Sequence, residues 1–441
     1  MQEIISKMVF SQTTQLWSLA EDANEYERMH NLLSGELKSV LDDEKITSVL
    51  REKTATSLID GEFVLALHDP CDIRKAYAKK LENIGRVRDL DGNMINGYST
   101  LGTVCLSSES QELHFCDISV FSNGDKAHYV LQTELDAVLN KKAKAEKEQE
   151  AAAFTKREKE IIELVERDEY VNLRQVVHAQ LKRVSEELKK GKKKLRICHV
   201  IDRQMDGVPY FSFIDEVLDD LFVIRAKISR NSNEMIVNED GKEVAIKLVD
   251  VLLPHKHVDV IEKVRLNKRN YQDVKRIIEW GILKLEGADY SVVRITLLDR
   301  KGKEIFLKPM LLITNLPIKK AKDALETYFI YLKRAKIEGA FKFVKNALGW
   351  EEFQVRDWES IKNIIALAFF IGGYFYEIEP ELANHPVISW LSQLGGGKGK
   401  ITRHYFLEGL KNLLIYQQVE RFREKTRLRD EEWSDILEFA L

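Results

Sequence analysis

Four side chains in the last third of the chain combine charges and a hydroxyl at spacings that suit phosphate chemistry. Tyr331, Arg334, Glu338 and Lys345 lie between Ala321 and Leu348, a stretch that we expect to be one helix. At about 100° per residue, their side chains fall within one arc of roughly 60°. A carboxylate on such a face binds a divalent metal, while the cations neutralise phosphate oxygens during phosphoryl transfer. The alternative is a solvated face on which Glu338 pairs with its helix neighbours.

Two aspartates elsewhere in the chain follow short apolar runs. The run Phe63–His68 predicts a buried strand that ends at Asp69, and the run Leu195–Ile201 predicts a second strand that ends at Asp202. An aspartate after a strand is also a common turn residue or helix cap. Together with Glu338, however, these aspartates form a three-carboxylate set of the kind that holds two metal ions about 4 Å apart.

The stretches around these residues resemble the bacterial insertion-sequence transposases of the DDE type, in the cut-and-paste group marked by a Tyr-Arg-Glu-Lys signature. The matching stretches run in family order: Ala66–Pro70, His199–Asp206, Phe222–Ala226, Leu311–Asn315 and Tyr331–Lys345. The resemblance implies an α/β fold with a ribonuclease H-like catalytic core. It also implies that Asp69, Asp202 and Glu338 are the catalytic residues and hold Mg²⁺, for which Mn²⁺ substitutes.

The resemblance also assigns DNA-binding residues. Tyr331, Arg334 and Lys345 are expected to hold DNA phosphates, and Arg203 and Arg225 match positions of DNA-contacting arginines. A salt bridge at the edge of the core is the alternative for each of these two arginines. Near residues 308–310, where the family places an aromatic that receives a flipped base, this chain has none. The nearest aromatic residues are Trp280, Tyr290 and Phe306.

The interval between Asp202 and Glu338 has a β pattern of its own. Residues 235–237 and 244–249 flank an Asp-Gly turn and predict one hairpin, and residues 291–298 and 304–307 predict another. The resembling family has a β-rich insertion at this place. We therefore expect the regions 1–60 (helical, DNA-end recognition), 61–227 (core, first part), 228–316 (β-rich insertion), 317–379 (core, second part, with the signature helix) and 380–441 (helical, dimerisation or DNA contact).

The C-terminal region has two further features. The glycine-rich stretch 395–400 departs from the Walker pattern, so a flexible loop explains it better than a nucleotide site. The stretch 404–425 predicts an amphipathic helix, which suits either pairing with another subunit or burial against its own chain.

Composition sets bounds on the class of protein. A chain of 441 residues with 44% hydrophobic content can bury a sizeable core. Its net charge is −3, so any DNA-binding surface must come from local clusters of Lys and Arg. The four cysteines lack CxxC spacing, which favours reduced thiols. No apolar signal segment is evident, and the apolar run 364–376 is too short to span a bilayer. We therefore expect a cytoplasmic protein, associated with the nucleoid and without a membrane partner.

The combined expectation is a Mg²⁺-dependent DNA transposase. It would cut an insertion sequence at its terminal inverted repeats and join the 3′-OH ends to target DNA by two-metal phosphoryl transfer. Its partners would be double-stranded DNA and a second copy of the chain in a paired-end complex. Two alternatives stay open: a metal-dependent nuclease without joining activity, and a non-catalytic DNA-binding regulator derived from a transposase.

Overall fold

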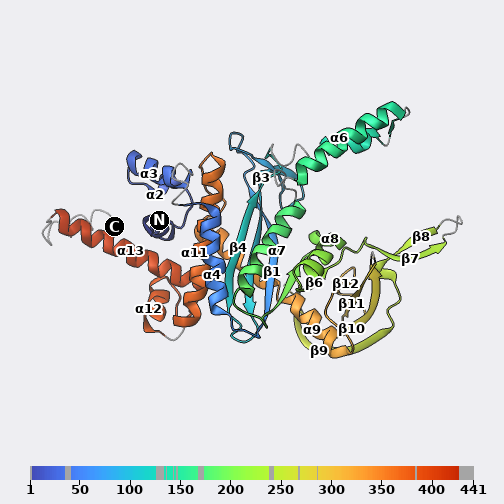
Figure 1. Cartoon of the computed structure of the whole chain (residues 1–441). Coiled ribbons are helices and arrows are strands. Elements are labelled where there is room, and N and C mark those ends of the chain that lie inside the picture. The colour runs from blue at the N-terminus through green and yellow to red at the C-terminus, as the bar shows by residue number, and fades with distance from the viewer. Residues whose placement is uncertain are drawn as a thin grey trace. The chain divides into compact units, whose positions relative to one another are not determined.

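The computed structural model describes residues 2–34, 41–125, 134–135, 137–142, 144–145, 148–166, 173–237, 243–266, 269–285, 287–382 and 385–426 (Figure 1). The chain divides into two compact units. The helical unit comprises Met1–Ile46, Lys80–Glu82 and Ala340–Leu441, and the sheet unit comprises Thr47–Lys79 and Asn83–Gly339. The carboxylates Asp69, Asp202 and Glu338 all belong to the sheet unit.

The sheet unit is built on one large mixed β-sheet. Its strands are β1 (Phe63–Arg74), β2 (Gly85–Arg88), β3 (Met94–Ser107), β4 (Leu113–Phe121), β5 (Arg196–Ile201), β6 (Leu221–Arg225), β9 (His255–Leu266), β10 (Arg269–Leu285), β11 (Ala288–Leu298) and β12 (Met310–Thr314). They pair in the order β2-β3-β1-β5-β6-β12-β11-β10-β9, and β4 pairs with β3. β3 is antiparallel to both β1 and β4, so the sheet opens with an antiparallel meander, which the apolar runs and turn residues of this region also predict. β5 is parallel to β1, and β6 is parallel to β5.

Strand β1 is longer than the apolar run predicts, so Asp69 lies inside the strand instead of at its end. Asp69 pairs across to Gly102 on β3. On the other side, the pairing of β1 with β5 ends at Leu67. A proline at position 70 is tolerated because this side of β1 has no ladder hydrogen bond left to make. Asp69 therefore stands where the parallel neighbour has stopped, while Asp202 directly follows β5 as expected.

Asn-Gly is a pair typical of tight turns, and from the sequence alone Asn96-Gly97 predicts one, but the pair lies within β3. A Cβ atom on Gly97 would lie 2.3 Å from the Ile73 carbonyl oxygen and 2.5 Å from Val87 Cγ2. The glycine is thus explained by the close approach of neighbouring strands and not by turn geometry.

Helix α7 (Leu173–Lys189) packs along the sheet beside β4, and α6 (Glu148–Glu166) precedes it in the chain (Figure 1). α7 buries Val177, Leu181, Val184 and Leu188, a spacing that places them on one helix face. After β5 come three short elements: η1 (Arg203–Met205), α8 (Val208–Ser212) and the single π turn η2 (Phe213–Val217). Phe211 and Ile214 from these elements join Leu181 in the main core cluster.

The expected single signature helix is in fact two helices. α9 (Ala321–Leu332) ends before Lys333, and α10 (Ala335–Leu348) begins after Arg334. The amide of Arg334 bonds to the Tyr331 carbonyl and that of Ile337 to the Arg334 carbonyl, the tight three-residue pattern that interrupts an α-helix. The regular 100° rotation therefore does not hold across the signature.

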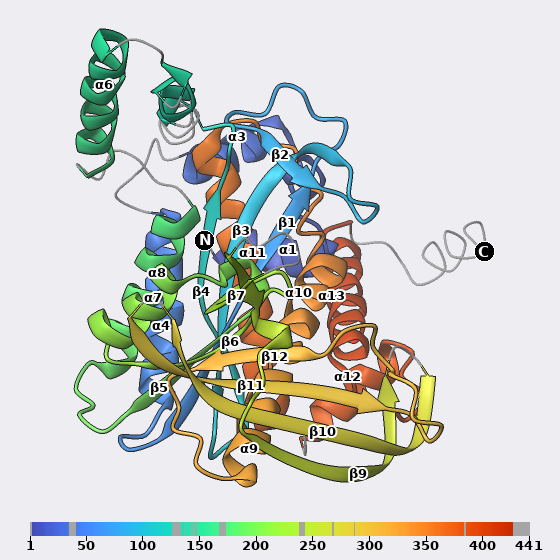
Figure 2. The same cartoon turned by 90° about the vertical axis from the view of Figure 1, so that its right-hand side faces the viewer.

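The β pattern between Asp202 and Glu338 is confirmed, with a different pairing. The first hairpin forms as β7 (Asn231–Val237) and β8 (Glu243–Lys247), and η3 (Leu248–Asp250) follows it. The second hairpin forms only next to its turn, where Leu298 bridges Glu304 and the Ile305 amide donates to the Leu297 carbonyl. The rest of β11 pairs with β10 and β12 instead. The long β9–β10 ribbon, which the sequence did not lead us to expect, lies beside β11 (Figure 2). Because β12 pairs with β6, these strands extend the main sheet.

The helical unit consists of α1 (Gln2–Ser11), α2 (Leu16–Leu19), α3 (Ala23–Leu33), α11 (Trp358–Leu382), α12 (Pro386–Leu394) and α13 (Arg403–Thr426). α4 (Asp43–Ser57) and α10 each contribute residues to both units. The apolar run 364–376 lies within α11, and its residues Ile364 to Phe369 are buried. Among the residues with described structure, no helix combines the length and apolar character needed to cross a membrane.

The glycine-rich stretch closes the α12–α13 corner. A Cβ atom on Gly395 would lie 2.0 Å from the Tyr405 carbonyl oxygen, and one on Gly409 would lie 1.7 Å from that of Leu391. These glycines let two helices approach closely. The expected amphipathic helix is α13, which buries Leu407 but leaves Tyr416 62% exposed. The four cysteines are free thiols.

Candidate active site

Two of the four signature residues contact the two strand-borne aspartates. The Tyr331 hydroxyl donates a hydrogen bond to Asp202 Oδ1 at 3.1 Å. Arg334 Nη1 donates to Asp69 Oδ1 at 2.5 Å, and its Nη2 pairs with Glu338. One guanidinium thus joins the carboxylate of β1 to that of α10, and the tyrosine joins α9 to the residue after β5.

The site is buried on one side and open on the other. The side chains of Arg334 and Asp69 are 13% and 18% exposed, whereas Glu338 is 56% exposed. A substrate would therefore meet Glu338 first, with Asp69 and Arg334 behind it. The charge-assisted bond between Arg334 and Asp69 is largely shielded from water and therefore strong, whereas the bond with Glu338 is partly exposed to solvent.

Tyr331 is held as a neutral hydrogen-bond donor. Burial and the neighbouring Asp202 raise its pKa, while Arg334 and Arg225 oppose the rise. Arg225, at the end of β6, thus lies near the Tyr331 hydroxyl, and it pairs across the sheet with Leu312 of β12. The phenol stays protonated at neutral pH and fixes the position of the Asp202 carboxylate.

Asp69 is a largely buried carboxylate that lies beside two other carboxylates. Its pKa is raised to about 7, chiefly by burial and further by Glu338 and Asp202, and the opposing effect of Arg334 does not cancel these contributions. A group with a raised pKa next to two other carboxylates is typical of sites that bind a cation or perform acid–base chemistry.

The donor set fits a hard divalent cation. Asp69, Asp202 and Glu338 offer carboxylate oxygens, the ligands that Mg²⁺ prefers, and the negative charge around Asp69 would be offset by such an ion. In the part of the chain that the structure describes, no three metal-ligating side chains are already gathered as a coordination shell. Arg334 is the cation between Asp69 and Glu338 in this arrangement.

The remaining DNA-binding candidates lie in different places. Lys345 belongs to the helical unit, where its Nζ pairs with Glu351 Oε1 at 2.9 Å. Arg203 lies directly after Asp202, is exposed, and lines a pocket. Of the five candidates, Tyr331, Arg334 and Arg225 lie at the carboxylates and Arg203 lies beside them.

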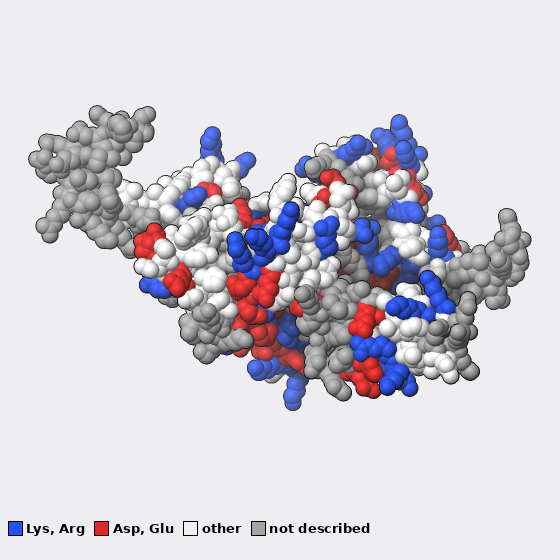
Figure 3. All heavy atoms as spheres, turned by 90° about the horizontal axis from the view of Figure 1, so that it is seen from above, with Lys and Arg blue, Asp and Glu red and all other residues white. Residues whose placement is uncertain are grey.

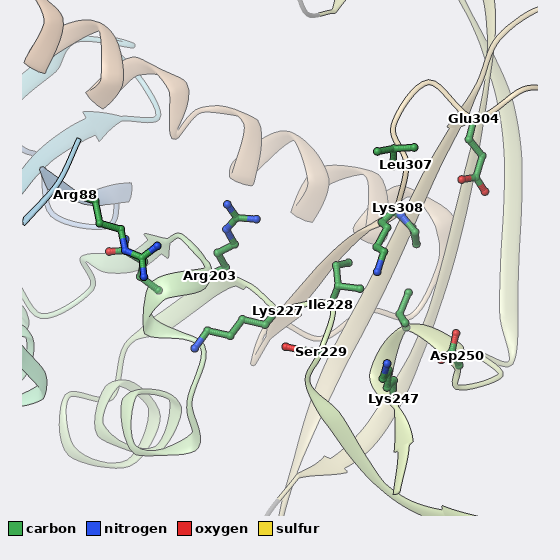
Figure 4. Close-up of a pocket in the computed structure, with 13 residues that line it drawn as sticks. Arg88, Arg203, Lys227, Ile228, Ser229, Lys247, Asp250, Glu304, Leu307 and Lys308 are labelled. Carbon is green, nitrogen blue, oxygen red and sulfur yellow. The ribbon is translucent and has the colours of Figure 1, made fainter. Parts of the chain in front are cut away.

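The pocket beside Asp202 has a volume of about 920 Å³ and is rich in cations. Arg203 follows β5, Lys227 follows β6, and Lys308 precedes β12, and their side chains surround a common space (Figure 4). Its basic lining residues are Arg88, Arg203, Lys227, Lys247 and Lys308, and its acidic ones are Asp250 and Glu304. Sequence reasoning missed Lys227 and Lys308, because only the pairing of β12 with β6 brings them together.

Asp206 connects two of the loops that line this pocket. Asp206 accepts a hydrogen bond from the Lys227 amide at 2.7 Å and pairs with Arg230. The loop after β5 is therefore tied to the loop after β6. On the face shown in Figure 3, basic and acidic side chains are interspersed. The lining of the pocket, in contrast, has more basic than acidic residues.

The aromatic residues near this pocket differ in accessibility. Trp280 and Tyr290 are 6% and 1% exposed, and Tyr290 is part of the main core cluster. Phe306 is 39% exposed and lies one position before Leu307, a residue of the pocket wall. Phe306 is therefore the one of the three that a ligand can reach.

A chain of buried polar side chains links the strands that carry the aspartates. His68 Nε2 lies 2.8 Å from His199 Nδ1, and His199 Nε2 lies 3.1 Å from Asp220 Oδ2. At the other end, His68 Nδ1 lies 2.8 Å from Thr103 Oγ1, which accepts from Gln180 Nε2. All five residues are buried.

The direction of these hydrogen bonds follows from Asp220. Its pKa is lowered by His199, Lys189 and Ser185 despite the opposing effect of burial, so it is an acceptor. His199 therefore donates from Nε2 and accepts at Nδ1 from His68, and His68 accepts at Nδ1 from the Thr103 hydroxyl. Burial, with His199 alongside, lowers the pKa of His68, so the His68 ring is neutral at neutral pH. This chain fixes β3, β1 and β5 next to Asp69 and Asp202.

The hydrogen-bond chain had a signal in the sequence, since a histidine stands in each apolar run that leads to an aspartate. Thr103, Gln180 and Asp220 carried no such signal.

No protein-family model and no curated protein matches this polypeptide chain.

The raised pKa of Asp69 predicts a pH-dependent stability in the absence of divalent metal. The unfolded carboxyl loses its proton near pH 4 and the folded one near pH 7, so this group lowers the free energy of unfolding as pH rises between these values. The loss is on the order of 4 kcal/mol at most. Urea unfolding from pH 4 to 8 should show this fall in the wild type and not in Asp69→Asn.

Asp91→Asn, at an exposed turn, serves as the control and should follow the wild-type profile. Mg²⁺ should stabilise the wild type more at pH 8 than at pH 6, because the ion competes with the proton for Asp69. Parallel profiles for wild type and Asp69→Asn would show that Asp69 titrates normally.

The buried chain predicts a specific cost for Thr103→Val. Valine has nearly the same shape but leaves His68 Nδ1 without a donor and the Gln180 amide without an acceptor. We expect a loss of about 2–4 kcal/mol of unfolding free energy by urea titration, since each unsatisfied buried group costs about 1–3 kcal/mol. Thr103→Ser keeps the hydroxyl and should cost about 1 kcal/mol. Equal losses in the two variants would contradict the hydrogen-bond chain.

Proposed function

We propose that the protein is a metal-dependent DNA transposase of the DDE type, which cuts DNA at the ends of an insertion sequence and joins the freed 3′-OH ends to target DNA. The observation that carries the proposal is the contact of Arg334 with both Asp69 and Glu338, together with the contact of Tyr331 with Asp202. Arg334 meets Asp69 from 265 positions away and Tyr331 meets Asp202 from 129 positions away, whereas Arg334 and Glu338 are neighbours four positions apart.

The topology of the sheet supports a ribonuclease H-like core. Five strands follow the order β4-β3-β1-β5-β6, with the first three antiparallel and β5 and β6 parallel to β1. Asp69 stands on the central strand of the five, and Asp202 follows its parallel neighbour. The strands β9 to β12 then correspond to the β-rich insertion of the family.

Each residue of the site has a role in this proposal. A divalent ion held by Asp69, Asp202 and Glu338 would activate water and stabilise the leaving 3′-oxygen. Arg334, whose two partners are ion ligands, neutralises the cleaved phosphate. Tyr331 orients Asp202 through its hydroxyl, and Arg225 stands beside that hydroxyl.

The basic pocket supports DNA as the substrate. Arg203 is adjacent in sequence to Asp202. A phosphate in the pocket would therefore belong to the same DNA strand as the phosphodiester at the carboxylates. Lys227 and Lys308 add positive charge from two other loops. This local field is sufficient for a chain with a net charge of −3.

The test of the function is cleavage and joining of DNA that carries the gene's own flanking repeats. With Mg²⁺, the wild type should release the fragment and transfer its 3′ ends to target DNA. Glu338→Gln should reduce both steps by at least about 100-fold, because the amide is a poor metal ligand. Glu326→Gln, on the exposed face of α9, is the matched control and should keep full activity.

The outcomes separate the proposal from its alternatives. Cleavage without strand transfer would indicate a nuclease, and binding without cleavage would indicate a regulator. Equal cleavage by wild type and Glu338→Gln would show that the carboxylates are not the active site.

The pocket predicts a change in the salt dependence of DNA binding. Lys308→Gln should weaken binding across all sequences and reduce the slope of log K against log salt by about 1, the loss of one phosphate contact. Lys301→Gln, in the exposed turn before the pocket loop, is the control. Anisotropy titrations at several salt concentrations measure the slope. The same slope in both variants would exclude Lys308 from the DNA surface.

A further inference from the structure

A second cavity, in the helical unit, is lined by aromatic residues. It has a volume of about 420 Å³ and lies between α2, α3 and the extended segment 354–356. Trp17 and Tyr26 meet edge to face with ring centroids 4.5 Å apart, and Tyr26 and His30 are stacked at 6.1 Å. Three rings from two short helices thus form one wall.

Trp17 is unusually exposed for a residue in this position. Its side chain is 61% exposed, although the same helix buries Leu16 and Leu19. An indole left in water at the wall of a cavity forgoes the hydrophobic stabilisation that burial gives. Of the three rings Trp17 is the exposed one, while Tyr26 and His30 are half-buried, so a ligand in the cavity would cover apolar surface chiefly at Trp17.

The segment 354–356 supplies the polar part of the lining. Gln354 and Arg356 are exposed and line the cavity, and the buried Val355 between them lines it as well. The Arg356 carbonyl accepts from the Glu82 amide at 2.9 Å, and Glu82 Oε2 accepts from the Trp358 amide at 2.7 Å. His30 Nε2 lies 3.0 Å from Asp357 Oδ2, which ties the aromatic wall to this segment.

These walls call for a flat ligand with a polar edge and a negative charge. An aromatic face stacks on a π system, an amide such as Gln354 recognises hydrogen-bonding edges, and a guanidinium such as Arg356 pairs with phosphate. A nucleotide has all three features. Within a duplex, a base presents neither face, because it is stacked on both sides.

We propose that this cavity binds an unpaired nucleobase of single-stranded DNA, stacked on Trp17, with Arg356 near its phosphate. The choice of DNA over a free nucleotide rests on the proposed function, and the site itself is additional to the carboxylates and the basic pocket. A chain that opens DNA ends would gain from holding a base that has lost its partner.

The test measures binding of the full chain in EDTA, so that cleavage does not contribute. The probes are a 12-residue oligothymidylate, the same length of abasic oligonucleotide, and a duplex, each followed by fluorescence anisotropy. Trp17→Ala should weaken binding of the oligothymidylate by about 5-fold to 150-fold and leave the abasic probe unchanged, the range expected for loss of one stacked base. Trp17→Phe keeps a ring and should lose less than about 3-fold.

Trp390→Ala is the matched control, because Trp390 is also in the helical unit and is 51% exposed. It should bind every probe as the wild type does. Equal binding of the abasic and normal probes, or equal behaviour of Trp17→Ala and Trp390→Ala, would overturn the proposal. Quenching of Trp17 by a proline-rich peptide and not by the oligonucleotide would overturn it in favour of a peptide site.

The two proposals fail in different ways. If Trp17→Ala changes nothing while repeat-bearing duplex is still cut in Mg²⁺, the nucleobase site alone is wrong. If the duplex is not cut but Trp17 is needed for the oligothymidylate, the proposed function is wrong and the nucleobase site stands.

Discussion

The paired contacts of Arg334 are the interaction on which the site depends. A single guanidinium, 13% exposed, holds Asp69 of β1 and Glu338 of α10, elements separated by more than 250 residues of chain. Arg334 stands at the break between α9 and α10, four positions before Glu338, and reaches Asp69 from there. A pair four positions apart also forms on a regular helix, so the contact with Asp69 is the one that ties this segment to β1.

A second set of contacts, a buried hydrogen-bond chain, connects the strands next to this site. In the His68–His199–Asp220 chain each ring nitrogen has one hydrogen-bond partner, and the direction of the bonds follows from Asp220 as the acceptor. Such a chain is costly to break because every member is desolvated. It joins β1 to β5, and its side chains take no part in the chemistry we propose. The position of the carboxylates is thus set by two groups of contacts, one ionic and partly open to solvent, the other buried.

The sequence was informative where the signal is local. The apolar runs before Asp69 and Asp202, the β7–β8 hairpin and the opening meander follow from patterns that extend over a few residues. Prediction from the sequence failed where the structure depends on residues that are far apart in the chain. β1 extends beyond His68 because β3 continues to pair with it, and Gly97 serves a close strand approach that no local pattern reveals. In the β9–β10 ribbon, charged residues alternate with valines and isoleucines. Its place at the edge of the large sheet depends on pairing with β11, which no local pattern reveals.

The pairing of β12 with β6 has a consequence for the chemistry. β6 lies beside β5, which ends at Asp202, and β12 begins just after Lys308. Arg203, Lys227, Lys308 and Asp202 therefore lie in loops at the ends of three adjacent strands of one hydrogen-bonded sheet. Because the sheet fixes the ends of these loops, a phosphate bound at Lys308 or Lys227 would be held near Asp202. This is the geometric demand of an in-line attack on a phosphodiester. A separate insertion domain on a flexible linker would not meet it, which gives a physical reason for the β-rich segment to continue the core sheet.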